Sequence, residues 1–267
     1  MSKLSDPHYL KTDQYKTAAN LNARVDIHRR FSTNPYGWNH WVFDRLASLP
    51  AQARILELGC GPAYLWAGNA DRIPAGWDIT LSDLSSGMLE AAKRSVAGAS
   101  RLFNFEVIDA QSLPYGDESF DVIIANHMLY HVPDRPRAIV EIRRALKTPA
   151  GRLIATTVGD RHMHELNTWL RRISQDPDFS LFPLPFTLES GLGQLQPYFR
   201  QVGVQRYEDG LRVTEIEPLI AYIGSSIRAR EFSADALAAL RSELKHELQS
   251  NGAIFITKDS GMFDAIK

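Results

Sequence analysis

Short apolar runs alternate with amphipathic segments over residues 53–158 of this 267-residue chain. The spacing predicts strands near 53–58, 77–82, 103–108, 120–125 and 151–158, with helices over 62–71, 86–97 and 134–147. Strands that alternate with helices are typical of parallel strands joined by crossover connections. We therefore predict an α/β fold with a three-layer, doubly wound sheet.

The segments on either side of this core follow a different pattern. Residues 15–50 are predicted to be helical, because apolar side chains recur at helical spacing until Pro50 ends the run. Beyond residue 158 we predict helices over 161–173, 187–199, 217–226 and 233–249, a proline-rich loop over 176–185, strands over 202–207 and 211–214, and a hairpin of 253–257 with 262–266. We thus expect one compact domain with a helical cap (1–50), a core (51–158), and lid helices with closing strands (159–267).

Composition narrows the class of protein. Hydrophobic residues make up 44% and charged residues 23%, which is typical of a soluble globular protein. The net charge of -1 gives no bulk attraction to nucleic acid or to an anionic membrane. No run approaches the roughly 20 apolar residues of a membrane span, and residues 1–7 lack the apolar core of a signal peptide. We expect a cytoplasmic monomer or homodimer that acts on a small molecule, with no nucleic-acid or membrane partner.

Acidic residues stand where the first three predicted strands end. The first strand contains Glu57 and stops at Gly59-Cys60-Gly61, the second ends at Asp83, and the third ends at Asp109. Glycines allow a ligand to approach the backbone closely, and a carboxylate that closes the next strand suits a ribose diol. Because the carboxyl ends of parallel strands meet at one rim, the pattern predicts a pocket for a nucleoside cofactor.

Two common nucleotide motifs fit this turn poorly. A dinucleotide turn usually reads G-x-G-x-x-G, whereas Tyr64 stands in the third glycine's place. The Walker motif needs a G-K-[ST] triplet, which does not follow the glycines. Cys60 is the only cysteine, so a disulfide within the chain and a cysteine-rich zinc site are both excluded. Because Cys60 lies between two glycines of the turn, its small size explains its presence there better than a nucleophilic role does.

With these residues, the stretch 53–158 resembles class I S-adenosylmethionine-dependent methyltransferases of the type 11 group, which includes quinone and small-molecule methyltransferases. The resemblance implies a mostly parallel seven-stranded sheet, S-adenosyl-L-methionine as cofactor and S-adenosyl-L-homocysteine as product. It assigns the methionine moiety to Glu57, Gly59 and Gly61, the ribose to Asp83, and adenine to Asp109 and Ala110. The remaining cofactor-binding residues that it implies are Cys60, Leu84, Met88, Gln111, Asn126 and His127. Related enzymes also close the pocket with an N-terminal helix, for which Tyr15 is our candidate, the alternative being aromatic packing.

The chain departs from the family pattern at two places. Ala63 replaces the third glycine of the turn, and Lys147-Thr148-Pro149-Ala150-Gly151 replaces the usual K-P-G-G. Neither change threatens cofactor binding. The Asn/Asp-Pro-Pro-Tyr/Phe motif of enzymes that methylate nucleobases or glutamine is absent from the fourth strand's end, which argues against those substrates.

Histidines are the candidate general bases, since an acidic acceptor group benefits from one near neutral pH. His127 leaves the fourth strand at the binding rim, and His131 follows it; each could instead form a structural hydrogen bond. His28 is a further candidate. His162 and His164 diverge by about 200 degrees on a helix, so at most one should face the pocket. We expect no metal site, because histidine ligands on a helix normally stand at i, i+3 or i, i+4, a spacing that this pair lacks. The aromatic segment 179–186 forms either an apolar acceptor wall or a loop pinned to the core.

The leading hypothesis is therefore a methyltransferase for a small, hydrophobic or aromatic acceptor. Two alternatives stay open. The fold could bind the cofactor and catalyse a non-methylating reaction such as a cyclisation, or it could serve as a non-catalytic binding protein. The intact acids and glycines argue against the second alternative.

Overall fold

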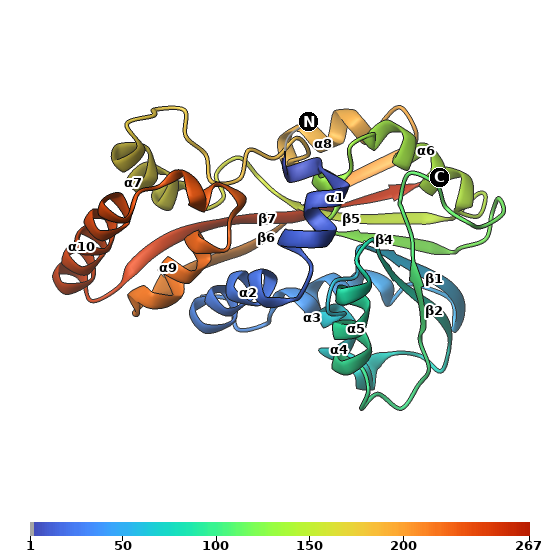
Figure 1. Ribbon diagram of the computed structural model, residues 1–267. Helices are drawn as coiled ribbons and strands as arrows, with labels where there is room; N and C mark the ends of the chain where they lie inside the picture. Colours follow the sequence, from blue (N-terminus) through green and yellow to red (C-terminus); the bar gives the residue numbers. More distant parts are fainter. Residues whose placement is uncertain (1–2) are drawn as a thin grey trace.

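The protein is built around a seven-stranded sheet in the computed structural model, which describes residues 3–267 without the side chains of residues 229 and 230 (Figure 1). The strand order is β3-β2-β1-β4-β5-β7-β6. The strands are β1 (Gln52–Leu58), β2 (Gly76–Asp83), β3 (Asn104–Val107), β4 (Val122–Asn126), β5 (Arg152–Val158), β6 (Gln201–Val213) and β7 (Ile254–Ile266). The first five are parallel, and β7 runs antiparallel to both β5 and β6. The predicted doubly wound, mostly parallel sheet is confirmed.

Helices cover both faces of this sheet. They are α1 (Pro7–Tyr9), α2 (Ala19–Phe31), α3 (Trp38–Phe43), α4 (Tyr64–Ala67), α5 (Ser86–Ser95), α6 (Arg135–Ala145), α7 (His164–Ser174), α8 (Leu188–Leu195), α9 (Ile216–Gly224) and α10 (Ala234–Asn251). Short helical turns separate some of them, including a π-helical turn over Leu10–Gln14. No helix in the described part of the chain is both long and apolar enough to cross a membrane.

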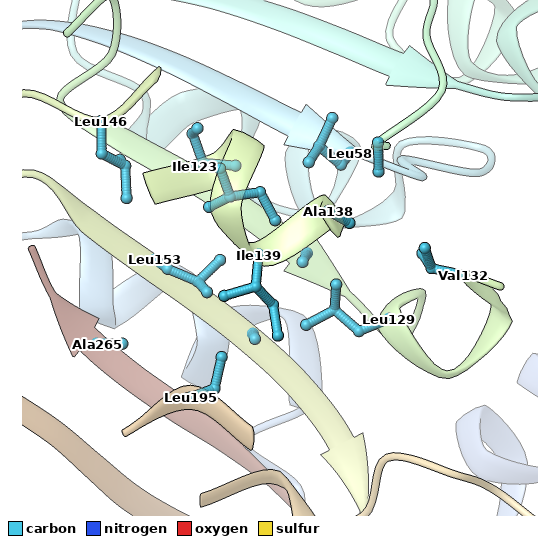
Figure 2. Close-up of a cluster of buried hydrophobic side chains, with 14 of the residues drawn as sticks. Leu58, Ile123, Leu129, Val132, Ala138, Ile139, Leu146, Leu153, Leu195 and Ala265 are labelled. Carbon is cyan, nitrogen blue, oxygen red and sulfur yellow. The ribbon is translucent and has the colours of Figure 1, made fainter. Parts of the chain in front are cut away.

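The core strands are apolar on both sides because each side meets a different helical layer. On β4, Ile123 and Ala125 belong to a cluster shared with α6 and α8, whereas Val122 and Ile124 face a cluster shared with α3, α4 and α5. Figure 2 shows the first cluster, in which Ile139 of α6 lies among residues of the sheet. A strand buried on both faces reads as a continuous apolar run, which is why the sequence reveals it.

The long strands β6 and β7 extend beyond the parallel strands and carry the C-terminal helices α7, α9 and α10 (Figure 1). A third apolar cluster fills this end of the molecule and includes Ile27 of α2, Leu166 of α7, Leu219 of α9, Leu240 of α10 and Ile256 of β7. The N-terminal helix α2 therefore packs on the C-terminal helices, so the two ends of the chain enclose the space above the sheet together.

Several predicted elements are wrong in extent. The helix predicted over 15–50 breaks between α2 and α3, because Ser32 bridges to Leu211 of β6 and Gly37 adopts a φ of 89°. The helix predicted over 62–71 is the short α4 followed by a separate turn at Ala70–Arg72. The two strands predicted over 202–214 are the single strand β6.

The hairpin predicted within 253–266 is also wrong, because β7 runs straight through the charged segment 258–261. Lys258 forms an ion pair with Asp209 of β6, and Asp259 forms one with Arg206. Gly261 lies so close to β6 that an added Cβ would stand 2.3 Å from the carbonyl oxygen of Gln205. Cross-strand ion pairs therefore accommodate, inside a strand, residues that are typical of a turn.

Candidate cofactor and acceptor site

A large cavity opens at the carboxyl ends of the parallel strands, beneath the N-terminal segment. Its volume is about 1740 Å³, whereas pockets for a single small ligand usually measure roughly 300–1,000 Å³. The space is thus sufficient for two ligands side by side. The residues predicted to bind the cofactor, together with His127 and His131, all line it: Tyr15, Glu57, Gly59, Cys60, Gly61, Asp83, Leu84, Met88, Asp109, Ala110, Gln111, Asn126, His127 and His131.

The glycine turn after β1 requires glycine at its first position. Gly59 has a φ of 65°, and a Cβ there would lie 2.8 Å from the Cβ of Met128. Gly61 has a φ of 53°. Ala63 also adopts a left-handed conformation, with φ 57° and ψ 35°, although it carries a side chain. The turn is therefore formed without the third glycine, at the cost of some backbone strain at Ala63.

Asp83 at the end of β2 is fixed by this turn. One carboxylate oxygen accepts the backbone N–H of Gly61 at 3.0 Å, and the other accepts that of Ser85 at 2.8 Å. Burial raises the pKa of Asp83, while these backbone hydrogen bonds act against the rise. Each carboxylate oxygen can accept more than one hydrogen bond, so the group keeps capacity for a diol.

The carboxyl group of Glu57 is buried at the same rim and forms no ion pair with a described residue. Its side chain accepts a hydrogen bond from the Trp66 indole at 2.6 Å and is 1% exposed. Burial raises the pKa of Glu57 to about 8, and the nearby charge of Asp83 adds to the rise. A cationic ligand group beside Glu57 would restore the charged carboxylate, which fits the ammonium and sulfonium charges of S-adenosylmethionine.

The remaining residues predicted to contact the cofactor surround this centre. Asp109 is exposed after β3, and its carboxylate accepts the backbone N–H of Gln111 at 2.9 Å. Met88 is buried in the first turn of α5. Burial raises the pKa of the Cys60 thiol well above its usual value, which disfavours the reactive thiolate. The acids of three successive strands therefore lie along one cavity wall.

Tyr15 closes the cavity through a hydrogen-bond chain. The Nδ1 of His131 lies 2.7 Å from the carbonyl oxygen of Leu4, so Nδ1 must donate and Nε2 must accept. The Tyr15 hydroxyl lies 2.8 Å from that Nε2, and Arg24 donates to the hydroxyl at 3.1 Å. The hydroxyl of Ser85 also donates to the Tyr15 carbonyl at 2.8 Å. Both ring nitrogens of His131 therefore have hydrogen-bond partners in this arrangement.

His127 stands between the two halves of the cavity. It leaves β4 with a φ of 52°, and its backbone N–H donates to Thr156 Oγ1 at 2.9 Å. Its ring packs on Trp38, with 5.2 Å between the ring centres. Burial lowers the pKa of His127 to about 4, helped by the charges of Lys258 and Arg24. The imidazole is therefore neutral at pH 7 and keeps a lone pair for a ligand, although its lowered pKa makes it a weaker base than a free imidazole. Asn126 beside it accepts from the Thr156 hydroxyl.

The far half of the cavity contains residues that sequence reasoning missed. Lys258 of β7 and Tyr222 of α9 line it together with His28 and His162. His162 lines the cavity whereas His164 is exposed outside it, which agrees with the prediction that at most one of the pair faces inward. The sequence did not mark Lys258 or Tyr222 as site residues, because Lys258 was predicted to lie in a turn and Tyr222 in an ordinary apolar helix.

The aromatic, proline-rich segment before α8 lies partly in the cavity and partly in the core. Leu181, Phe182, Pro183 and Leu184 line the cavity. Phe179 and Phe186 at the ends of the segment are instead buried in the core, at 1% and 0% exposure. The end residues thus anchor the loop, and the residues between them supply an apolar wall. In the described part of the chain, no group of three or more His, Cys, Asp or Glu side chains is arranged to hold a metal.

Comparison with known proteins identifies the central part of the chain. Residues 56–155 match the family described as "Methyltransferase domain". The chain is 33% identical over 185 residues to 27-O-demethylrifamycin SV methyltransferase of Amycolatopsis mediterranei, covering 66% of this chain and 59% of that protein. It is 30% identical over 159 residues to malonyl-[acyl-carrier protein] O-methyltransferase of Enterobacter lignolyticus, covering 58% and 59%. The chain thus spans about three fifths of these relatives' length.

Solved structures agree on the fold. The SeMet phosphoethanolamine N-methyltransferase 2 of Haemonchus contortus, solved with S-adenosyl-L-methionine, superposes with a TM-score of 0.60 at 22% identity, covering 100% of this chain and 60% of that one. The YcgJ protein of Bacillus subtilis gives a TM-score of 0.57 at 20% identity, covering 86% and 97%. At these identities the likeness shows the fold alone.

Proposed function

The chain carries a class I S-adenosylmethionine-dependent methyltransferase domain, and from this premise we propose that the protein transfers the methyl group of S-adenosyl-L-methionine to a small, hydrophobic or aromatic acceptor. The observation that carries the proposal is the cavity itself, which has acids at one end, an apolar wall at the other, and volume for two ligands. When bound, the cofactor supplies an activated methyl group on a sulfonium, and the reaction requires chiefly alignment and exclusion of water.

The acidic end fits the cofactor by the chemistry of its donors and acceptors. Glu57 and Asp83 suit a cationic methionine moiety and a ribose diol, and Gly59 leaves room that a side chain would fill. Asp109 with Ala110 suits the exocyclic amine and the face of adenine. We propose that Tyr15, with Leu84, Met88 and Gln111, completes this half, since all of them line the cavity.

We further propose that His127 contacts the acceptor and takes its proton where the acceptor is acidic. The neutral imidazole lies at the end of β4, between the acids and the apolar wall. His131 then acts as a positioning residue, because both of its ring nitrogens hold the N-terminal segment in place.

Label transfer tests the proposal. The protein is incubated with methyl-labelled S-adenosylmethionine and a panel of phenols, enols, amines and carboxylic acids, and labelled products are sought. Transfer to at least one acceptor supports methyl transfer. Cofactor binding without any transfer would favour the non-methylating alternative, and absence of binding would refute the proposal.

A substitution pair tests His127. Asn tolerates a left-handed backbone, so His127→Asn removes the imidazole without straining the turn. His164→Asn is the matched control, because His164 is exposed outside the cavity. We expect His127→Asn to lower turnover roughly 100-fold or more with little change in cofactor affinity. Equal turnover in the two variants would assign His127 a purely structural role.

A further inference from the structure

The far end of the cavity carries a basic cluster, which we define as His28, His162 and Lys258. These residues come from three elements: α2, the segment before α7, and β7. The rings of His28 and His162 are 5.9 Å apart between centres. The positive charge of Lys258 helps to lower the pKa of both imidazoles, after the larger effect of burial. The cluster therefore presents one ammonium group and two neutral imidazoles to the cavity.

Hydrogen bonding leaves this cluster ready for a ligand. The backbone N–H of Asp259 donates to Nδ1 of His162 at 3.3 Å, so the ring's proton is on Nε2 in the neutral form. Nδ1 of His28 is buried and has no hydrogen-bond partner among the described residues. A buried polar atom without a partner costs free energy unless a ligand satisfies it. His28 thus points to an occupant with a hydrogen-bonding group.

Lys258 is held in place by an ion pair. Its partner Asp209 is fully buried, and Lys258 is 7% exposed. Asp209 also accepts hydrogen bonds from Ser32 and from the backbone N–H groups of Thr33 and Asn34. Although burial alone would raise the pKa of Asp209, the hydrogen bonds from Lys258 and Ser32 lower it. An ionised Asp209 fixes Lys258, which has three N–H donors in all.

Acidic groups are distributed unevenly along the cavity. The lining acids are Asp26, Glu57, Asp83, Asp109 and Glu231, of which Glu57 is mostly protonated near pH 7. Of these, Asp26 is paired with Arg29 and Arg30, and Glu231 is paired with Arg228, so the acids without an arginine partner all lie at the cofactor end. Arg24 adds a further cation near the centre, where its only hydrogen bond among the described residues goes to Tyr15. Asp209 balances the charge of Lys258, so what the far end offers is hydrogen-bond donors, from Lys258, His162 and Arg24, with no unpaired acid beside them, and these donors favour an acceptor oxygen.

We propose that the basic cluster binds an acidic oxygen of the methyl acceptor, from a phenol, an enol or a carboxylic acid, and holds it as an oxyanion. This inference rests on the proposed function and names its substrate class. The acceptor oxygen gives up its proton to His127 or to water. A lone pair of that oxygen then forms the new O–C bond, and the C–S bond breaks with its electron pair remaining on sulfur. The products are a methyl ether or ester and a neutral thioether. An oxyanion and a sulfonium lose their opposite charges together, which matches an acid-to-base gradient along one cavity.

Probe binding tests the proposal without any turnover. The protein loaded with S-adenosylhomocysteine is titrated with 4-nitrophenol, whose absorbance distinguishes phenol from phenolate, and calorimetry compares benzoate with benzamide and acetylacetone with acetone. We expect the pKa of bound 4-nitrophenol to fall by about one unit or more, a tenfold change in its ionisation equilibrium. The anion that binds most tightly relative to its neutral partner shows whether the acceptor oxygen belongs to a phenol, a carboxylic acid or an enol. Failure of all three anions to bind better than the neutral probes would overturn the proposal.

Substitutions locate the effect in the cluster. Lys258→Gln keeps an N–H donor for Asp209 and removes the charge, and we expect it to weaken anion binding roughly tenfold or more while neutral probes change little. Lys245→Gln is the matched control, because Lys245 is exposed on α10 outside the cavity. His28→Gln is a second test if Lys258→Gln does not fold, as judged by circular dichroism. Anion affinities equal to wild type in the folded variants would overturn the proposal.

The outcome for the proposed function is read separately. If wild-type protein does not bind S-adenosylhomocysteine, the cofactor assignment fails, and the probe titration is then run on the protein alone. If the thioether binds but the anions do not, only the inference about the acceptor fails.

Discussion

Replacing Glu57 with Gln should change how stability depends on pH. The pKa of Glu57 rises from 4.5 to about 8 on burial, so the folded protein binds a proton that the unfolded chain releases in this range. For an acid with a raised pKa, stability is greatest below the unfolded value and falls as pH increases toward the folded value. Gln has the same shape, can still accept the Trp66 hydrogen bond, and does not titrate.

The magnitude follows from linkage. Each pH unit in which the folded state holds one extra proton lowers the free energy of unfolding by about 1.4 kcal/mol. Between pH 6.5 and 7.5 folded Glu57 is mostly protonated, so wild type should lose ~1.2 kcal/mol relative to Glu57→Gln over this interval.

Histidines also affect how the stability of the wild type depends on pH, but they do not affect the difference in stability between wild type and Glu57→Gln. His28, His127, His131 and His162 are partly buried along the cavity and have lowered pKa values, so each contributes stability that is lost as pH falls below about 6.5. The same histidines are present in both proteins, so subtracting the two profiles isolates Glu57. Urea unfolding without cofactor, at pH 6.5, 7.0 and 7.5, provides the measurement. A constant difference across these three pH values would show that Glu57 is ionised throughout, and would refute the reasoning.

Three further substitutions probe the turn and its cover. Gly59→Ala should destabilise the protein by about 1–3 kcal/mol, because the new side chain meets a φ of 65° and its Cβ would lie 2.8 Å from the Cβ of Met128. Each kcal/mol corresponds to a fall of roughly 2–4 °C in melting temperature, so a melting temperature within about 1 °C of wild type would contradict this. Ala63→Gly should change stability by less than about 1 kcal/mol, since relief of strain is offset by lost chain entropy, and urea unfolding checks it. Tyr15→Phe should speed limited proteolysis near the N-terminus by removing the hydroxyl between Arg24 and His131; unchanged cleavage would show that other contacts hold the segment.

The core of the fold could be predicted from the sequence because its strands are buried on both faces and end in chemically distinctive residues. The run before Gly59 is apolar on both sides of β1, and Glu57, Asp83 and Asp109 follow from simple rules about strand ends. These local signals do not depend on distant contacts. The residues that line the cofactor half of the cavity could be predicted from the sequence for the same reason.

The acceptor half depends on contacts between distant residues. Lys258 lies in a Lys-Asp-Ser-Gly segment that is typical of a turn, and pairing with β6, including its ion pair with Asp209, keeps it inside β7. The helix break after Phe31 likewise depends on Asp209, whose carboxylate accepts the backbone N–H groups of Thr33 and Asn34. Contacts with one buried carboxylate on β6 thus contribute to both features, and no local pattern in the sequence reveals those contacts.

Calorimetric titration of wild-type protein and Asp83→Ala with S-adenosylmethionine and S-adenosylhomocysteine tests the central claim most directly. Asp83 is fixed by the backbone N–H groups of Gly61 and Ser85 at the cavity wall, so its loss should remove a bidentate contact to the ribose. We predict one binding site in wild type and an affinity at least roughly tenfold weaker in the variant. Absence of binding to wild type, or equal affinity in both proteins, would contradict the account.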